Sequence, residues 1–164
     1  MDASPPPYTL RSNRPGDLGW VVQQHGRLYA QEYGWPTAFE GIVAGIVAAF
    51  VRDLDPERER CWIAERNGEN VGSVFLVRES DTVARLRLLS VDPSARGLGL
   101  GRRLVKECTR FAREAGYDTI VLWTDSILDA ALHLYESEGY RLVRETPHRT
   151  FGVDLIGQDW ELTL

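Results

Sequence analysis

The chain has 164 residues, of which 43% are hydrophobic and 26% are charged, and its formal net charge at pH 7 is −5. This length suits one domain with its own hydrophobic core. An acidic chain has no general attraction for phosphate backbones, so we expect no nucleic-acid partner. The two cysteines, Cys61 and Cys108, have no metal-ligand spacing, so we expect two small buried residues and no metal site.

Targeting signals are also not evident. No apolar run approaches the ~20 residues needed to span a bilayer. The start, MDASPPPYTL, has neither the basic nor the apolar region of a signal peptide. We therefore expect a cytoplasmic protein without a membrane partner, forming a single domain over residues 1–164 in which residues 1–7 are flexible.

Hydrophobic periodicity predicts the elements of the first half of the chain. A short strand at 8–12 and a turn precede two helices, at 18–33 and from Pro36 to about Leu54, whose apolar residues recur at helical spacing. After about residue 60 the apolar residues recur at every second position. This change predicts strands at 61–66 and 70–79, joined by an Asn-Gly hairpin turn, and a third strand at 82–91.

The second half begins with a glycine-rich loop and a helix from Gly99 to about Glu114. A fully apolar strand at 119–124, a helix at 128–138 and strands at 140–145 and 159–164 follow. The order β–α–α–β–β–β–α–β–α–β–β predicts an α+β fold, with a mixed, mostly antiparallel sheet flanked by helices and a central parallel βαβ crossover. The crossover places the loop where open sheets bind ligands.

The loop segment SVDPSARGLGLGRRL carries glycines at positions 97, 99 and 101. A helix start offers unpaired N–H groups and partial positive charge, and glycine lets an anion come close. The loop therefore suits a phosphate, although a connector that only packs a strand against a helix has the same composition. The loop does not match the dinucleotide-binding motif, because Arg102 occupies the position where that motif requires its last glycine. It does not match a P-loop either, because the Gly-Lys-Ser/Thr end is missing.

The remaining pattern, Arg-x-x-Gly-x-Gly after LLSVDPSA, resembles the acetyl-CoA motif of the GNAT superfamily of N-acetyltransferases. A second segment, AALHLYESEGYRLV, resembles the later motif of that family, with Tyr135 four residues ahead of Gly139. The predicted element order is also that of the family. Three further segments, GWVVQQHGRLYAQEYGW, ERCWIAERNGENVGSVFLV and HRTFGVDLIGQDWEL, look like the acetyltransferase domain fused behind MarR-type DNA-binding domains.

The resemblance implies that acetyl-CoA is the co-substrate, with no metal, and that its acetyl group passes directly to a primary amine of a small molecule or peptide. Loop N–H groups and Arg102 would hold the pyrophosphate. The strand before the loop would pair with the pantetheine arm and, at a bulge, aim an N–H at the thioester carbonyl. The implied cofactor-binding residues are Leu89, Ser90, Val91, Arg96, Gly97, Leu98, Gly99, Leu100, Gly101, Arg102, Ser126 and Tyr135.

Two positions next to these motifs depart from the family pattern. The family often has an asparagine after the apolar strand, whereas this chain has Asp125 and Ser126. Because a carboxylate would repel the cofactor phosphates, we expect Ser126 to make the contact and Asp125 to cap the next helix. Many members place a glutamate on the strand before the loop, but here Arg85 and Arg87 stand there.

The resemblance assigns Tyr135 as the general acid, since a phenol with an ordinary pKa of ~10 is protonated at neutral pH. Its helical spacing would also suit a core tyrosine, but the match to two motifs favours the acid. The general base is not assigned by the sequence, and a chain of waters could take its place. The preferred candidate bases are Glu79 and Glu32, and the other candidates are His25, His133 and His148.

The acceptor pocket is expected between the first two helices and the late β-hairpin. Tyr33, Trp35 and His148 are the candidate acceptor-binding residues, although aromatic residues at helical spacing also suit a core. The missing strand glutamate leaves open a non-catalytic acyl-CoA-binding or sensing domain. An interaction module that binds no CoA is a third reading. Many relatives dimerise through the late strands, so a homodimer is also considered.

Overall fold

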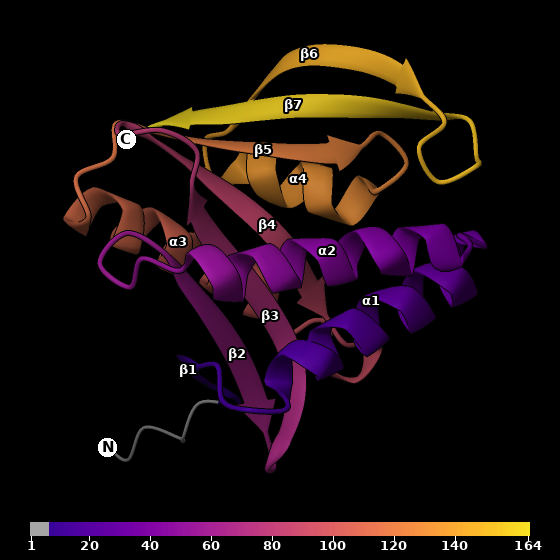
Figure 1. Cartoon of the computed structure of the whole chain (residues 1–164), viewed down its shortest axis with the longest axis horizontal. Coiled ribbons are helices and arrows are strands. Elements are labelled where there is room, and N and C mark those ends of the chain that lie inside the picture. The colour runs from indigo at the N-terminus through magenta and orange to yellow at the C-terminus, as the bar shows by residue number, and fades with distance from the viewer. Residues whose placement is uncertain (1–6) are drawn as a thin grey trace.

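The computed structural model describes residues 7–164 and shows one seven-stranded sheet with helices packed against it (Figure 1). The predicted element order and the α+β fold are confirmed. The proposed flexibility of residues 1–7 falls almost wholly outside the described residues. The elements are β1 (Thr9–Ser12), α1 (Asp17–Tyr33), α2 (Thr37–Asp53), β2 (Arg60–Arg66), β3 (Glu69–Arg78), β4 (Val83–Val91), the 3-10 turn η1 (Pro93–Ala95), α3 (Leu100–Glu114), β5 (Thr119–Asp125), α4 (Asp129–Ser137), β6 (Arg141–His148) and β7 (Leu155–Thr163).

The last two strands are longer and lie closer together in the chain than the sequence predicts. Strand β6 continues to His148, and β7 already begins at Leu155. Strand β6 lies at the edge of the sheet, and nearly all of its residues are exposed, so its sequence shows no alternating pattern. An edge strand also tolerates Pro147, which cannot donate a ladder hydrogen bond.

The sheet order is β1-β2-β3-β4-β5-β7-β6, and the only parallel pair among the described strands is β4 with β5. This pair is hydrogen-bonded only over Val83–Arg85 and Thr119–Val121. Beyond these residues the two strands diverge, as Figure 1 shows. The carboxyl-terminal half of β4 therefore has an edge that β5 does not cover.

The core lies on both faces of the sheet because side chains alternate along each strand. In β2, Trp62 and Ala64 pack in the cluster that includes α3, while Cys61 and Ile63 pack in the cluster that includes α1 and α2. Cys61 and Cys108 are buried free thiols, as predicted, and burial raises the pKa of each. Within residues 7–164, no helix is both long and apolar enough to cross a membrane.

Candidate functional site

The glycine loop leads into α3 with main-chain donors available. Gly97 and Gly99 have φ of +81° and +75°, the left-handed region that favours glycine. The first main-chain bond of α3 joins Arg103 N–H to Gly99 O at 3.1 Å. The N–H groups of Leu100, Gly101 and Arg102 precede that bond, so helix geometry leaves them free to receive an anion.

A cavity of about 500 Å³, which we call the loop cavity, lies against this loop, the end of β4, α1 and α4. Leu98 instead packs against the core, and Ser126 lies outside the lining of the cavity. Tyr135 lines the neighbouring cavity described below. The remaining predicted cofactor-binding residues all line the loop cavity: Leu89, Ser90, Val91, Arg96, Gly97, Gly99, Leu100, Gly101 and Arg102.

Both arginines of the loop cavity are paired with carboxylates. Arg96 forms a close ion pair with Glu32, and Arg102 lies 2.9 Å from Glu138. The arginine side chains are 54% and 52% exposed, and exposed pairs contribute little to stability, so both guanidinium groups can turn to another anion. Glu32 and Tyr33 line the loop cavity. Neither of them lines the neighbouring cavity, which is lined by Tyr135.

Strand β4 contains a bulge where the resemblance implied one. Ser73 pairs with Ser90, whereas Phe75 pairs with Arg87, so two residues of β4 lie opposite one of β3. Leu88 has φ of +53°, and its carbonyl oxygen accepts a 3.1 Å hydrogen bond from Ser73 Oγ. A left-handed leucine is strained, and such residues are concentrated at functional sites.

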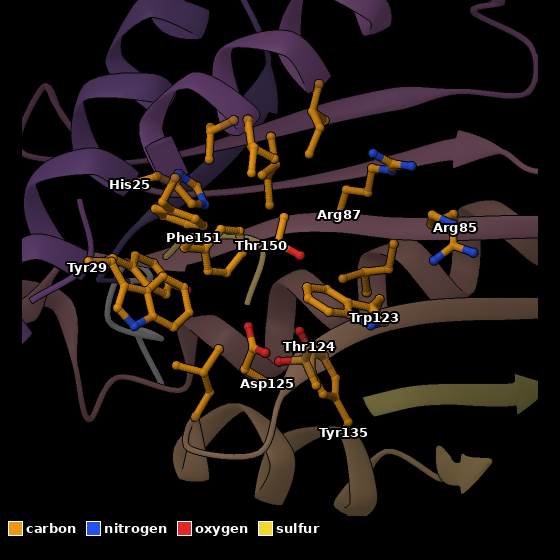
Figure 2. Close-up of a pocket in the computed structure, with 18 residues that line it drawn as sticks. His25, Tyr29, Arg85, Arg87, Trp123, Thr124, Asp125, Tyr135, Thr150 and Phe151 are labelled. Atoms are coloured by element: carbon orange, nitrogen blue, oxygen red, sulfur yellow. The ribbon is translucent and has the colours of Figure 1, made fainter. Parts of the chain in front are cut away.

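A second cavity, of about 370 Å³, is lined by aromatic and aliphatic side chains with a few polar ones, and we call it the aromatic cavity (Figure 2). Trp35 and Phe151 are each 4% exposed, and their ring centroids are 4.8 Å apart. This contact fixes the β6–β7 loop over the α2 side of the cavity. Its lining consists of His25, Tyr29, Trp35, Phe39, Ile42, Val43, Ile46, Arg85, Leu86, Arg87, Leu88, Trp123, Thr124, Asp125, Leu128, Tyr135, Thr150 and Phe151.

The two cavities adjoin, because Tyr29 and Leu128 line both of them. Tyr135 projects from α4 into the aromatic cavity, as Figure 2 shows, while Leu134 of the same helix lines the loop cavity. Tyr135 is 5% exposed, and burial together with nearby Tyr29 raises the pKa of its phenol. The hydroxyl is therefore a protonated donor at neutral pH.

Asp125 ends β5 and points into the aromatic cavity on the same side as Tyr135 (Figure 2). Its Oδ1 lies 2.6 Å from Nε2 of His148. Thr150 N–H donates to His148 Nδ1 at 3.2 Å, which leaves the N–H of Nε2 to be donated to Asp125. Burial raises the pKa of Asp125, and the bond to His148 partly opposes that rise.

The prediction that Asp125 caps the next helix is wrong. Helix α4 begins after Leu128 without a side-chain cap, and the carboxylate is turned away to His148. The sequence contained one signal of this placement in the cavity, since Asp125 ends a strand of the parallel pair, where open sheets place their functional groups.

Two of the candidate bases predicted from the sequence, Glu79 and His133, line neither cavity. Glu79 is held by Arg85 at 2.8 Å, a contact that lowers the pKa of the carboxyl, and it lines neither cavity. His133 is exposed on α4. His25 lines the aromatic cavity, and its Nδ1 donates to Val21 O at 2.8 Å. Burial lowers the pKa of His25 to about 4, so its ring is neutral at pH 7.

Comparison with known proteins shows the family of the chain. The model of the acetyltransferase (GNAT) family matches residues 20–140. The chain belongs to the GNAT family. The seven-stranded mixed sheet, with its single parallel pair among the described strands, is accordingly a GNAT fold.

Relatives of this GNAT protein differ in length. It is 30% identical to the N-alpha-acetyltransferase RimI of Mycobacterium tuberculosis, over 94% of this chain and 92% of the relative. It is 30% identical to a mycothiol acetyltransferase of Thermomonospora curvata over 83% of this chain, and 40% identical to an N-acetylaspartate synthetase of Danio rerio over 59%. Of the latter two relatives, the chain spans only 45% and 35% of the length.

Solved structures show the same GNAT fold at low sequence identity. A GNAT acetyltransferase from Staphylococcus aureus Mu50 has a TM-score of 0.77 at 18% identity, covering 96% of this chain and 99% of that one. The protein yncA from Salmonella typhimurium, solved with its cofactor acetyl-CoA, has a TM-score of 0.74 at 20% identity, covering 96% and 94%.

Proposed function

We propose that the protein transfers the acetyl group of acetyl-CoA directly to a primary amine within a ternary complex. The observation that carries this proposal is the junction of the two cavities at Tyr29 and Leu128, beside a buried phenol, Tyr135, and a buried carboxylate, Asp125. A donor in one cavity and an acceptor in the other would meet there. The relatives named as acetyltransferases, RimI among them, support the same activity.

The loop cavity fits the donor. The left-handed Gly97 and Gly99 leave the approach to the helix start open, because a Cβ built at either glycine would meet no atom within 4 Å. The N–H groups of α3, with Arg96 and Arg102, suit a pyrophosphate. Bound there, acetyl-CoA would supply the acetyl group as a thioester. The edge of β4 that β5 leaves uncovered suits the amides of the pantetheine arm.

Different side chains at the junction carry out the separate proton transfers. Asp125 accepts a proton from the acceptor ammonium, since its carboxylate is buried in the aromatic cavity and its pKa is raised. His148 orients that carboxylate. Tyr135 donates a proton to the departing thiolate, and its phenolate takes the second proton that the acceptor nitrogen loses as the amide forms. The main-chain N–H at the β4 bulge stabilises negative charge on the carbonyl oxygen.

This assignment replaces Glu79 and Glu32 as preferred bases. The pKa of Glu79 is lowered by Arg85, and Glu32 is paired with Arg96 in the loop cavity. Trp35 and His148 remain proposed acceptor-side residues, whereas Tyr33 is reassigned to the donor side. The single domain over residues 1–164, the resemblance to domains of MarR-type fusions, the cytoplasmic location and a homodimer stay predictions.

The test is release of the CoA thiol from acetyl-CoA in the presence of a broad panel of primary amines. We expect turnover with at least one class of amine and formation of its N-acetyl product. CoA binding by calorimetry, measured in parallel, separates the alternatives. Tight CoA binding without thiol release from any amine would favour the non-catalytic binding domain, and no CoA binding would contradict both.

A further inference from the structure

The aromatic cavity contains two cations that the proposed transfer does not use. Arg85 and Arg87 both line it from β4, where residues two apart project from the same face. Figure 2 shows them together at one end of the cavity, with Asp125 and Tyr135 on the opposite wall. An amine acceptor has no need of a positive wall, since its ammonium would be repelled by one.

The two arginines differ in how their charge is balanced. Arg85 Nε lies 2.8 Å from Glu79 Oε2, so its charge is largely neutralised. Among residues 7–164, no carboxylate lies within ion-pair distance of Arg87, and its buried Nε has no hydrogen-bond partner. An unsatisfied buried donor on a charged group is costly, so a ligand that satisfies it gains the corresponding free energy.

The electrostatics around Arg87 also favour a ligand that carries a negative charge. Burial and the charge of neighbouring Arg85 lower the pKa of Arg87, which means that its surroundings disfavour the positive charge. A negatively charged group from a ligand would offset both effects. A guanidinium has the planar, forked arrangement of donors that binds a carboxylate through two parallel hydrogen bonds.

We propose that the acceptor is a small amine that also carries a carboxylate, bound with its ammonium at Asp125 and its carboxylate at Arg87. The inference rests on the proposed function, because it takes the aromatic cavity as the acceptor site. The apolar walls between the two ends, which include Trp123 and Phe151, suit the carbon body of an amino acid. A cavity of about 370 Å³, closed on one side by the β6–β7 loop, suits a small molecule.

The test compares binding of matched acceptor pairs to the protein saturated with CoA, which carries no acetyl group, so that no turnover is needed. The pairs are L-phenylalanine with phenethylamine, L-leucine with 3-methylbutylamine, and 4-aminobutyrate with propylamine. They distinguish an α-carboxylate from a distant one. By calorimetry we expect the acid of at least one pair to bind about tenfold tighter than its amine partner. Equal affinity within all three pairs would overturn the inference.

Two variants test whether Arg87 causes the tighter binding of the acid in each pair. Arg87→Gln should reduce the ratio of the two affinities to within about threefold, because one charged bidentate contact is lost. Arg113→Gln, an exposed arginine on α3 that lines neither cavity, makes the same change of charge and should keep the ratio. A ratio that survives in Arg87→Gln would also overturn the inference. Thiol release is read separately, so a failure of acetyl transfer would be seen independently of acceptor preference.

Discussion

His148 Nε2 donates a 2.6 Å hydrogen bond to Asp125 Oδ1 and so joins the end of β6 to the end of β5. The rings of His148 and Trp123 also lie 4.9 Å apart. The pair is well enclosed, with the two side chains 13% and 3% exposed. A buried carboxylate with an orienting histidine is suited to take a proton from a bound ammonium.

Replacing Asp125 with Asn should lower kcat/KM by about 100-fold or more, because an amide cannot accept the proton. CoA affinity should stay within about threefold of the original value, since Asp125 does not line the loop cavity. The acid limb of the pH profile of kcat/KM, where activity rises as Asp125 ionises, should disappear. Because His148 lowers the pKa of Asp125, His148→Ala should instead move that limb to higher pH. An unmoved limb in His148→Ala would contradict the role given to the pair.

Replacing Tyr135 with Phe should lower kcat well over tenfold by removing the donor for the departing thiolate. Tyr140→Phe is the matched control, because it also deletes a hydroxyl from a buried ring. The ring centroid of Tyr140 lies 5.7 Å from that of Tyr135, and Tyr140 lines neither cavity. Steady-state rates and CoA affinity should be measured for both variants. An unchanged kcat in Tyr135→Phe would remove the general-acid assignment.

Much of the fold could be predicted from the sequence, because local signals agree with the tertiary structure. Apolar residues recur at periods of 3.6 and two where the structure has helices and strands. The structure also contains the Asn-Gly turn at Asn67–Gly68 and the glycine loop that the sequence indicates. Exposed β6 was harder to delimit, since an edge strand with no buried face has no alternation to read. The glycine loop is contiguous in the sequence, so its motif could be recognised there.

The proposed acceptor side of the site could not be predicted in the same way, because its parts come together only through the sheet. Asp125 and His148 are 23 residues apart and meet where β5, β7 and β6 lie next to one another. Glu32 and Tyr33 face the loop cavity because of the rotation of α1, which a sequence pattern does not define closely enough. That Arg87 has no carboxylate partner among residues 7–164 likewise depends on Glu79, which contacts Arg85 instead.

Placing a carboxylate at Gly101 should weaken CoA binding. A Cβ there would lie 3.1 Å from Leu134 Cδ2 and 3.8 Å from Val91 Cγ2, which line the loop cavity, so the new side chain would project into it. Repulsion of a nearby phosphate then predicts that Gly101→Glu raises the Kd for CoA about tenfold or more. Gly45→Glu on α2, with no atom within 4 Å of its Cβ, should leave the Kd unchanged. Equal CoA affinity in both variants would place the pyrophosphate elsewhere.

Asp17 should make stability depend on pH below about 4. It accepts hydrogen bonds from Arg11, from the Arg14 main chain and from Asn70, and these lower its pKa from 3.8 to about 2. A carboxyl with a lowered folded-state pKa stabilises the fold above its unfolded pKa, and this contribution is lost as pH falls from about 4 towards 2. Asp17→Asn should therefore cost about 2 kcal/mol at pH 7 and much less near pH 2, measured by urea unfolding. The exposed Asp53→Asn should change little, and equal losses at both pH values in Asp17→Asn would contradict the linkage.

Glu32 should weaken donor binding, because its carboxylate lines the loop cavity and competes for Arg96. We expect Glu32→Gln to lower the Kd for CoA about threefold, with Glu57→Gln, an exposed carboxylate outside both cavities, as the control. The gain should shrink as the salt concentration rises, because exposed charges are screened. It should also be smaller in an Arg96→Gln background, since the competition for that guanidinium is then absent. Weaker CoA binding by Glu32→Gln would show instead that the ion pair holds Arg96 in position for the pyrophosphate.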